Sequence, residues 1–104
     1  MAFQWKITIK PNVPPSPQKF TPNPLPNVLV SDEVFWSNDD TQAHWPGLKK
    51  DDGTIDTKFF MPNQIAPNST SNAFRPSGPG NLNYVCSLPG HEKETGTIQV
   101  GSGS

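Results

Sequence analysis

The stretch "YVCSLPGHEKETGTIQV", residues 84–100, determines how the rest of this sequence is interpreted, because it contains the single cysteine and one of the two histidines. Cys86 ends an apolar run that is typical of a strand, and a Pro-Gly turn leads to His91. Glu94 then precedes a second β-rich run. Such a turn can bring sulfur and imidazole to one centre, and thiolate with imidazole suits copper or zinc. A buried Cys86 without a metal is the alternative, since free cysteine is among the most buried residue types.

Length and composition predict one domain, with no room for a second core in 104 residues. We place the domain at residues 1–100 and interpret the Gly-Ser-Gly-Ser end, 101–104, as an added tail. The chain could also be one domain of a larger protein. A net charge of −1 with no basic stripe argues against nucleic acid as a partner. No apolar run is long enough for a membrane span, and no signal peptide is visible.

The thirteen prolines and eight glycines exclude a helical bundle and favour a small all-β domain with long loops. The alternation of Phe3, Trp5, Ile7 and Ile9 with polar residues is typical of a half-buried strand. The proline-rich segment 11–26 is expected to be extended and ordered by packing, with disorder as the alternative. About seven or eight strands are expected in all, as in a sandwich. The runs that carry this prediction are 2–10, 27–30, 33–38, 57–61, 71–75, 81–86 and 96–100.

The other histidine, His44, ends the stretch "VFWSNDDTQAH", residues 34–44. A strand again runs into a loop there, so His44 could reach the same end of a sandwich as Cys86 and His91. The three residues would then form a His₂Cys set, which with a weak axial ligand is the arrangement of electron-transfer copper sites. Asn38 and Asp39 could brace the His44 loop by hydrogen bonds or could only form a turn.

These stretches resemble the cupredoxins, the small type 1 blue copper proteins. The run 34–44 is similar to the family's Val-x-Trp-x-Asn strand and first histidine ligand, and "GPGNLNYVCSLPGH", residues 78–91, to its ligand loop. The Cys-x₄-His spacing with Pro-Gly before the histidine is similar to that of azurin and rusticyanin. The resemblance implies a Greek-key β-sandwich of seven to eight strands, one copper ion, and His44, Cys86 and His91 as its ligands.

The sequence departs from the family pattern at the axial position. Most cupredoxins have methionine two residues before the glycine of the last strand, and here Glu94 stands two residues before Gly96. A carboxylate is a harder ligand than a thioether and would favour Cu(II), which lowers the reduction potential. Nitrosocyanin, a red copper protein, is a family precedent for a glutamate ligand, which there comes from elsewhere in the chain. Alternatively, Glu94 points to solvent beside Lys93, and Met61, water or nothing takes the fourth position.

The resemblance implies a one-electron carrier that is not an enzyme, works with an unidentified redox partner protein, and lies in the periplasm or elsewhere outside the cytoplasm. Two other classes stay open. A copper site with an open or carboxylate-bound position could bind a small molecule, and Cys86, His44, His91 and Glu94 would also satisfy a structural zinc ion. A Cys–His nucleophile is the weakest alternative, because the sequence offers no base or oxyanion hole for it.

Overall fold

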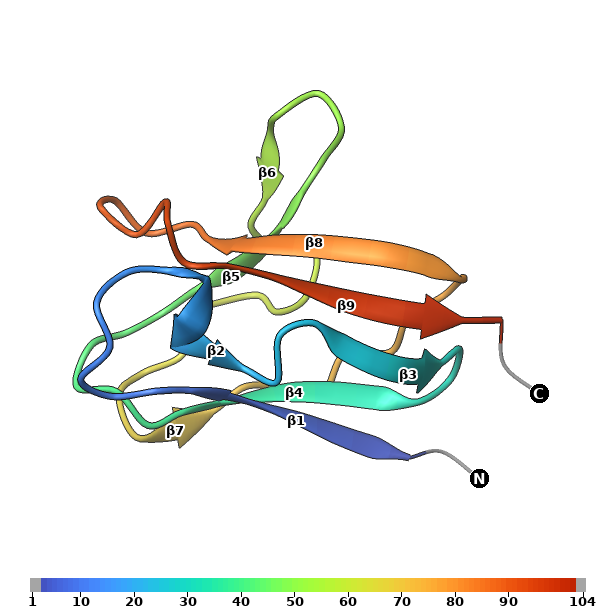
Figure 1. Ribbon diagram of the computed structural model, residues 1–104, viewed down its shortest axis with the longest axis horizontal. Helices are drawn as coiled ribbons and strands as arrows, with labels where there is room; N and C mark the ends of the chain where they lie inside the picture. The colour runs from blue at the N-terminus through green and yellow to red at the C-terminus, as the bar shows by residue number, and fades with distance from the viewer. Residues whose placement is uncertain (1–2, 103–104) are drawn as a thin grey trace.

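The computed structural model describes residues 3–102, and these residues form a nearly all-β sandwich of two mixed sheets (Figure 1). One sheet has four strands in the order β2-β1-β4-β7, and the other has five in the order β3-β9-β8-β5-β6. The elements are β1 (Gln4–Ile9), the 3₁₀ helix η1 (Pro17–Lys19), β2 (Phe20–Thr21), β3 (Leu25–Leu29), β4 (Glu33–Asn38), β5 (Pro46–Lys49), β6 (Ile55–Asp56), β7 (Ser69–Thr70), β8 (Gly80–Cys86) and β9 (Thr95–Gly101). The all-β sandwich predicted from the sequence is confirmed.

The long strands pair within the two sheets, and their alternating polar and apolar residues face opposite sides of each sheet. β1 runs parallel to β4, from Gln4 opposite Glu33 to Ile9 opposite Asn38. β8 runs antiparallel to β9, and β3 runs parallel to β9 at the edge of that sheet. In β1 the side chain of Ile7 is fully buried while Gln4 is exposed, because successive side chains of a strand point to opposite faces.

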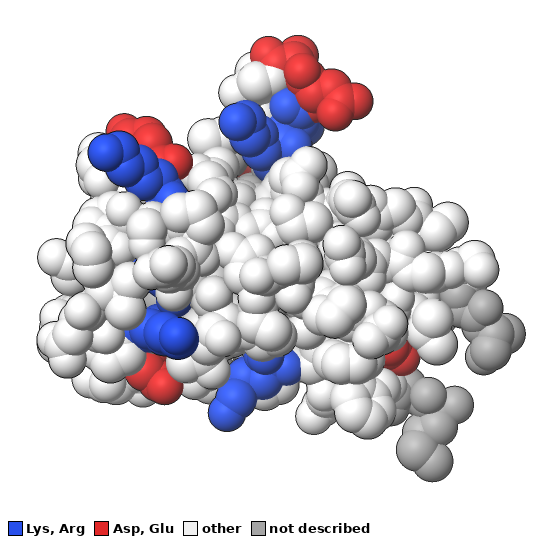
Figure 2. All heavy atoms as spheres, viewed as in Figure 1, with Lys and Arg blue, Asp and Glu red and all other residues white. Residues whose placement is uncertain are grey.

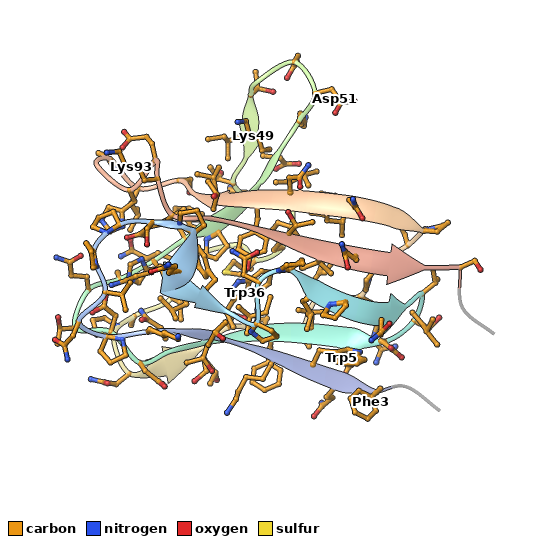
Figure 3. All side chains as sticks on the ribbon, viewed as in Figure 1. Phe3, Trp5, Trp36, Lys49, Asp51 and Lys93 are labelled. Carbon is orange, nitrogen blue, oxygen red and sulfur yellow. The ribbon has the colours of Figure 1, made fainter. Side chains whose placement is uncertain are left out.

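An aromatic cluster fills the space between the sheets. Trp36 of β4 is fully buried and lies between the two layers in Figure 3. Its ring makes edge contacts with Tyr84 of β8, with centroids 5.4 Å apart, and with Phe60, with centroids 5.1 Å apart. Since aromatic side chains bury large areas and edge contacts add to that gain, this cluster joins the two sheets without a disulfide.

The strands predicted at 57–61 and 71–75 were wrong. Residues 57–60 form turns and bends, although Phe60 and Met61 are buried in the core, because a side chain can pack between sheets without a strand ladder behind it. Within 71–75 only Phe74 forms an isolated bridge, to Val34. Residues 46–49 instead form β5. The sequence did not predict this strand, because it begins with Pro46 and Gly47, residue types that are uncommon in strands.

The proline-rich segment is structured rather than disordered. It contains η1, β2 and the start of β3, and Phe20 and Leu25 within it are buried in the core. Backbone bonds hold it as well, since the Lys10 amide donates to the Lys19 carbonyl over 2.8 Å. The segment therefore forms part of the domain.

Three connections meet at one end of the sandwich. Figure 1 shows the β1–β2 connection in blue and the β4–β5 connection in cyan to green at the same end as the orange-red β8–β9 loop. Lys93 labels the tip of that last loop in Figure 3. On the face in Figure 2, charged side chains gather at this tip and at the tip of the β5–β6 hairpin, and further charged side chains lie along the lower part of the molecule. Among the described residues, no helix is long and apolar enough to cross a bilayer.

Gly96 lies where β9 passes the ring of Tyr84, and a Cβ added there would overlap that ring. We expect Gly96→Ala to destabilise the metal-free protein by about 1–3 kcal/mol, because the buried ring cannot move aside without disturbing the aromatic cluster. Urea unfolding measures the change. Gly101→Ala is the control, since a Cβ there would meet Leu29 at an ordinary 3.4 Å. Equal effects of the two substitutions would contradict this account of the packing.

Candidate metal centre

The loop that carries His44 is held in place by the side chain of Asn38 and by the backbone of Ile65. Asn38, at the end of β4, is fully buried and donates to the carbonyls of Gln42, over 2.8 Å, and Ile65, over 3.1 Å. The backbones of His44 and Ile65 also exchange two hydrogen bonds, of 3.1 and 2.7 Å. Asn38 therefore braces the His44 loop, whereas the Asp39 carboxylate accepts from the hydroxyl of Ser37 instead.

Cys86 reaches the centre from the last position of β8, opposite Pro46 of β5. Its amide donates to the Glu94 carbonyl over 2.9 Å, which closes the β8–β9 loop at its base. Its Sγ accepts a hydrogen bond from the Trp45 amide at 3.4 Å. This contact ties the sulfur to the residue that follows His44.

The β8–β9 loop turns tightly and brings two more donors to this sulfur. The His91 amide donates to the Leu88 carbonyl over 3.1 Å, and the Glu94 amide donates to the His91 carbonyl over 3.0 Å. Gly90 has a φ of 83°, a left-handed conformation that glycine adopts without strain. These turns direct both the His91 ring and the Glu94 carboxylate inward.

Glu94 is the central residue of the cluster. Its Oε1 lies 2.9 Å from Nδ1 of His44 and 3.0 Å from Nδ1 of His91. The side chain is 1% exposed, so the alternative in which Glu94 points to solvent is wrong. Both Nδ1 nitrogens therefore face one common point, with the carboxylate between them.

The four predicted side chains meet at one place. One ligand atom from each of His44, Cys86, His91 and Glu94 lies within 4.8 Å of every other. Cys86 Sγ is 3.8 Å from Nδ1 of His44. Metal–ligand bonds of about 2.0–2.3 Å in a tetrahedral site place ligand atoms roughly 3–4 Å apart, so small shifts would let this set hold one metal ion. Met61, the other axial alternative, belongs to the hydrophobic core cluster.

The metal-free site is held together by charge. Burial opposes a charge on His44, but hydrogen bonds to Cys86, Glu94 and Asp40 outweigh burial and raise its pKa to about 10. Burial likewise opposes a charge on Glu94, and the two histidines overcome it and lower the pKa of that carboxyl. His44 is therefore protonated at neutral pH in the metal-free protein, and a metal ion would displace its Nδ1 proton.

The sequence interpretation missed two residues behind His44. Oδ2 of Asp40 lies 2.8 Å from Nε2 of His44, and Nζ of Lys19 lies 2.7 Å from the same oxygen. Burial opposes the charge on Asp40, but Lys19, His44 and the Thr41 amide together lower its pKa to about 2. The i,i+4 spacing of Asp40 and His44 could have indicated the first contact, whereas nothing local indicates Lys19.

Solved structures of known proteins share this fold. A purple cupredoxin from Nitrosopumilus maritimus superposes with a TM-score of 0.77 at 20% identity, over 93% of this chain and 99% of that one. A Cu(I) amicyanin variant gives a TM-score of 0.68 at 16% identity, over 94% of this chain and 82% of its own. Amicyanin from Paracoccus versutus gives 0.62 at 18% identity, over 97% and 84% of the two chains.

The chain thus has the cupredoxin fold, as its resemblance to that family implied. Its cluster of two histidines, a cysteine and a glutamate fits a cupredoxin ligand set for a single metal ion. No protein-family model and no curated protein sequence matches the chain.

The charge on His44 predicts how the metal-free protein responds to pH. Its folded pKa of about 10 lies above the ordinary 6.5, so its stabilising effect is complete below pH 6.5 and is lost as pH rises toward 10. We expect the free energy of unfolding to fall by about 2–4 kcal/mol across this range. Urea titrations at a series of pH values measure it. Glu94→Gln should flatten the profile, and a wild-type profile that stays level or rises would contradict the assignment.

Proposed function

We propose that this protein is a one-electron carrier that binds a single copper ion through His44, Cys86, His91 and Glu94. The observation that carries the proposal is the convergence of a buried thiol, two imidazole Nδ1 atoms and a buried carboxylate within 4.8 Å. Thiolate with imidazole is the donor chemistry of type 1 copper, and the shared fold with copper-containing amicyanin supports the choice of copper. Bound copper would supply the Cu(II)/Cu(I) couple.

The protein's part in electron transfer is to keep the ligands still. His44, Cys86 and Glu94 are each no more than 1% exposed. The backbone of His44 is hydrogen-bonded to Ile65 of another connection, and those of Cys86 and Glu94 are hydrogen-bonded within the β8–β9 loop. A closely packed site changes little in geometry when the charge on the metal changes, so little reorganisation opposes transfer. Nothing in this arrangement calls for bond-making chemistry.

His91 is the natural route for the electron. Its side chain is 17% exposed, whereas that of His44 is fully buried. Leu88 is half-buried and Pro89 exposed on the same loop, which gives the ring an apolar surround. A redox partner protein would dock on this surface. The similarity to cupredoxins favours a location outside the cytoplasm.

The axial carboxylate makes this site differ from a common blue copper centre. Glu94 is the fourth donor in place of a methionine, and carboxylate oxygen favours Cu(II) over Cu(I). The proposed carrier therefore has a low reduction potential. An open position for a small molecule would require Glu94, which is 1% exposed and lies among the other three proposed ligands, to leave the centre.

One equivalent of Cu(II) added to the purified protein should produce an intense visible band and a bound Cu(II) signal in electron paramagnetic resonance. Cys86→Ser should abolish the band while leaving the far-ultraviolet circular dichroism unchanged, because the band arises from the copper–thiolate bond. A band that persists in Cys86→Ser would refute the ligand assignment. If the wild-type protein stays colourless and binds zinc tightly, the result would favour a structural zinc site over copper-based electron transfer.

Glu94→Met should raise the reduction potential and shift the spectrum toward that of a blue site. We expect at least an approximately tenfold change in the Cu(II)/Cu(I) equilibrium, or ~59 mV for a one-electron couple. Cyclic voltammetry measures it. Glu92→Met is the matched control, because Glu92 is an exposed carboxylate on the same loop. Equal potentials for wild type and Glu94→Met would mean that Glu94 does not bind the metal.

A further inference from the structure

A buried lysine extends from the proline-rich segment toward the metal centre. Lys19 ends η1, and its side chain is only 6% exposed. Its Nζ donates to Oδ2 of Asp40 and to the carbonyl of Val13, each over 2.7 Å. Since lysine is almost never fully buried unless it is paired, these two acceptors explain why it can lie there.

Asp40 connects this lysine to His44. Its own amide donates to Oδ1 of Asn38 over 3.0 Å, and its Oδ1 accepts from the Thr41 amide over 2.8 Å. Its other oxygen, Oδ2, accepts from Nε2 of His44 over 2.8 Å. The carboxylate is therefore fixed by its own turn before it contacts the ring.

This contact determines which nitrogen of His44 is left for a metal. A carboxylate beside Nε2 keeps the proton on that nitrogen, so Nδ1 is the one that can lose its proton and coordinate. Nδ1 is also the atom that faces Cys86 and Glu94, at 3.8 and 2.9 Å. The ring can turn over only by breaking the Asp40 contact.

Lys19 changes the charge that surrounds the metal. Ionised Cys86, Glu94 and Asp40 would place three negative charges in a buried region. Once a metal has displaced the Nδ1 proton of His44, Lys19 would be the cation in contact with Asp40. In a medium of low dielectric constant such charges interact strongly and favour the more positive metal state. A positive Lys19 offsets the contribution of Asp40 and thereby favours Cu(I).

We propose that Lys19 and Asp40 are positioning residues of the metal centre: Asp40 fixes the orientation and tautomer of His44, and Lys19 offsets its charge to set the reduction potential. The proline-rich segment is then part of the metal site. The statements on the potential and on the tautomer concern the metal-bound protein and rest on the proposed copper function, whereas the orientation of the His44 ring concerns the metal-free protein as well.

The orientation of His44 can be tested without metal, by nuclear magnetic resonance of protein labelled with ¹⁵N in histidine. Wild type should show a slowly exchanging, downfield Nε2–H proton for His44. Asp40→Ala should lose this resonance and weaken Cu(II) binding by about tenfold or more, as outer partners of ligand histidines commonly do. Asp40→Asn should keep it, because an amide oxygen can still accept. Loss in both variants, or in neither, would overturn the orienting role.

The electrostatic role has a signature that simple loss of packing would not produce. Lys19→Met should lower the reduction potential and Asp40→Asn should raise it, each by about tenfold in the Cu(II)/Cu(I) equilibrium, or ~59 mV. The double variant should return close to wild type, because it removes the opposite charges together. Shifts of the same sign in the two single variants would overturn the proposal.

Lys10→Met is the matched control, since Lys10 is exposed and its backbone bond to Lys19 remains. Its potential should equal that of wild type, and a shift as large as that of Lys19→Met would also overturn the proposal. A wild-type protein that takes up no copper would refute the proposed function and the effect on the potential. The resonance experiment would still decide whether Asp40 orients His44.

Discussion

The shared hydrogen bonding of Glu94 to both histidines is the interaction on which the metal end of this protein depends. Its Oε1 lies 2.9 Å from one Nδ1 and 3.0 Å from the other, with Glu94 and His44 almost fully buried and His91 partly exposed. A buried carboxylate is costly unless it is paired, and the two imidazoles provide that pairing in the absence of a metal. The same atoms that would coordinate an ion thus also pair with one another and hold the site in shape.

This arrangement explains why the loops around the site are bound so closely to the sandwich. The Asn38 contacts hold the first histidine from β4, and the Cys86–Glu94 backbone bond closes the ligand loop. The aromatic cluster around Trp36 fixes the two sheets that support these loops. A displacement of either sheet would separate ligands that come from different layers, so the rigidity of the core serves the centre directly.

Asp40 and Lys19, behind His44, are also buried charges that are stabilised by pairing. Asp40 and Lys19 form a buried pair whose position behind His44 gives it an electrostatic influence on any bound ion. Buried ion pairs contribute little to stability on their own, because desolvation offsets their attraction. We therefore propose that the pair serves to orient His44, a proposed metal ligand, rather than to stabilise the fold.

The sequence alone determined the all-β class and the ligand candidates, because period-2 alternation and the Cys-x₄-His turn are local patterns. It misplaced strands at 57–61 and 71–75, where apolar residues pack into the core without a ladder. Only the tertiary structure decided that Glu94 turns inward and that Lys19 reaches Asp40. Both outcomes depend on contacts between segments distant in sequence, since a buried charge is stable only where the fold provides its partner.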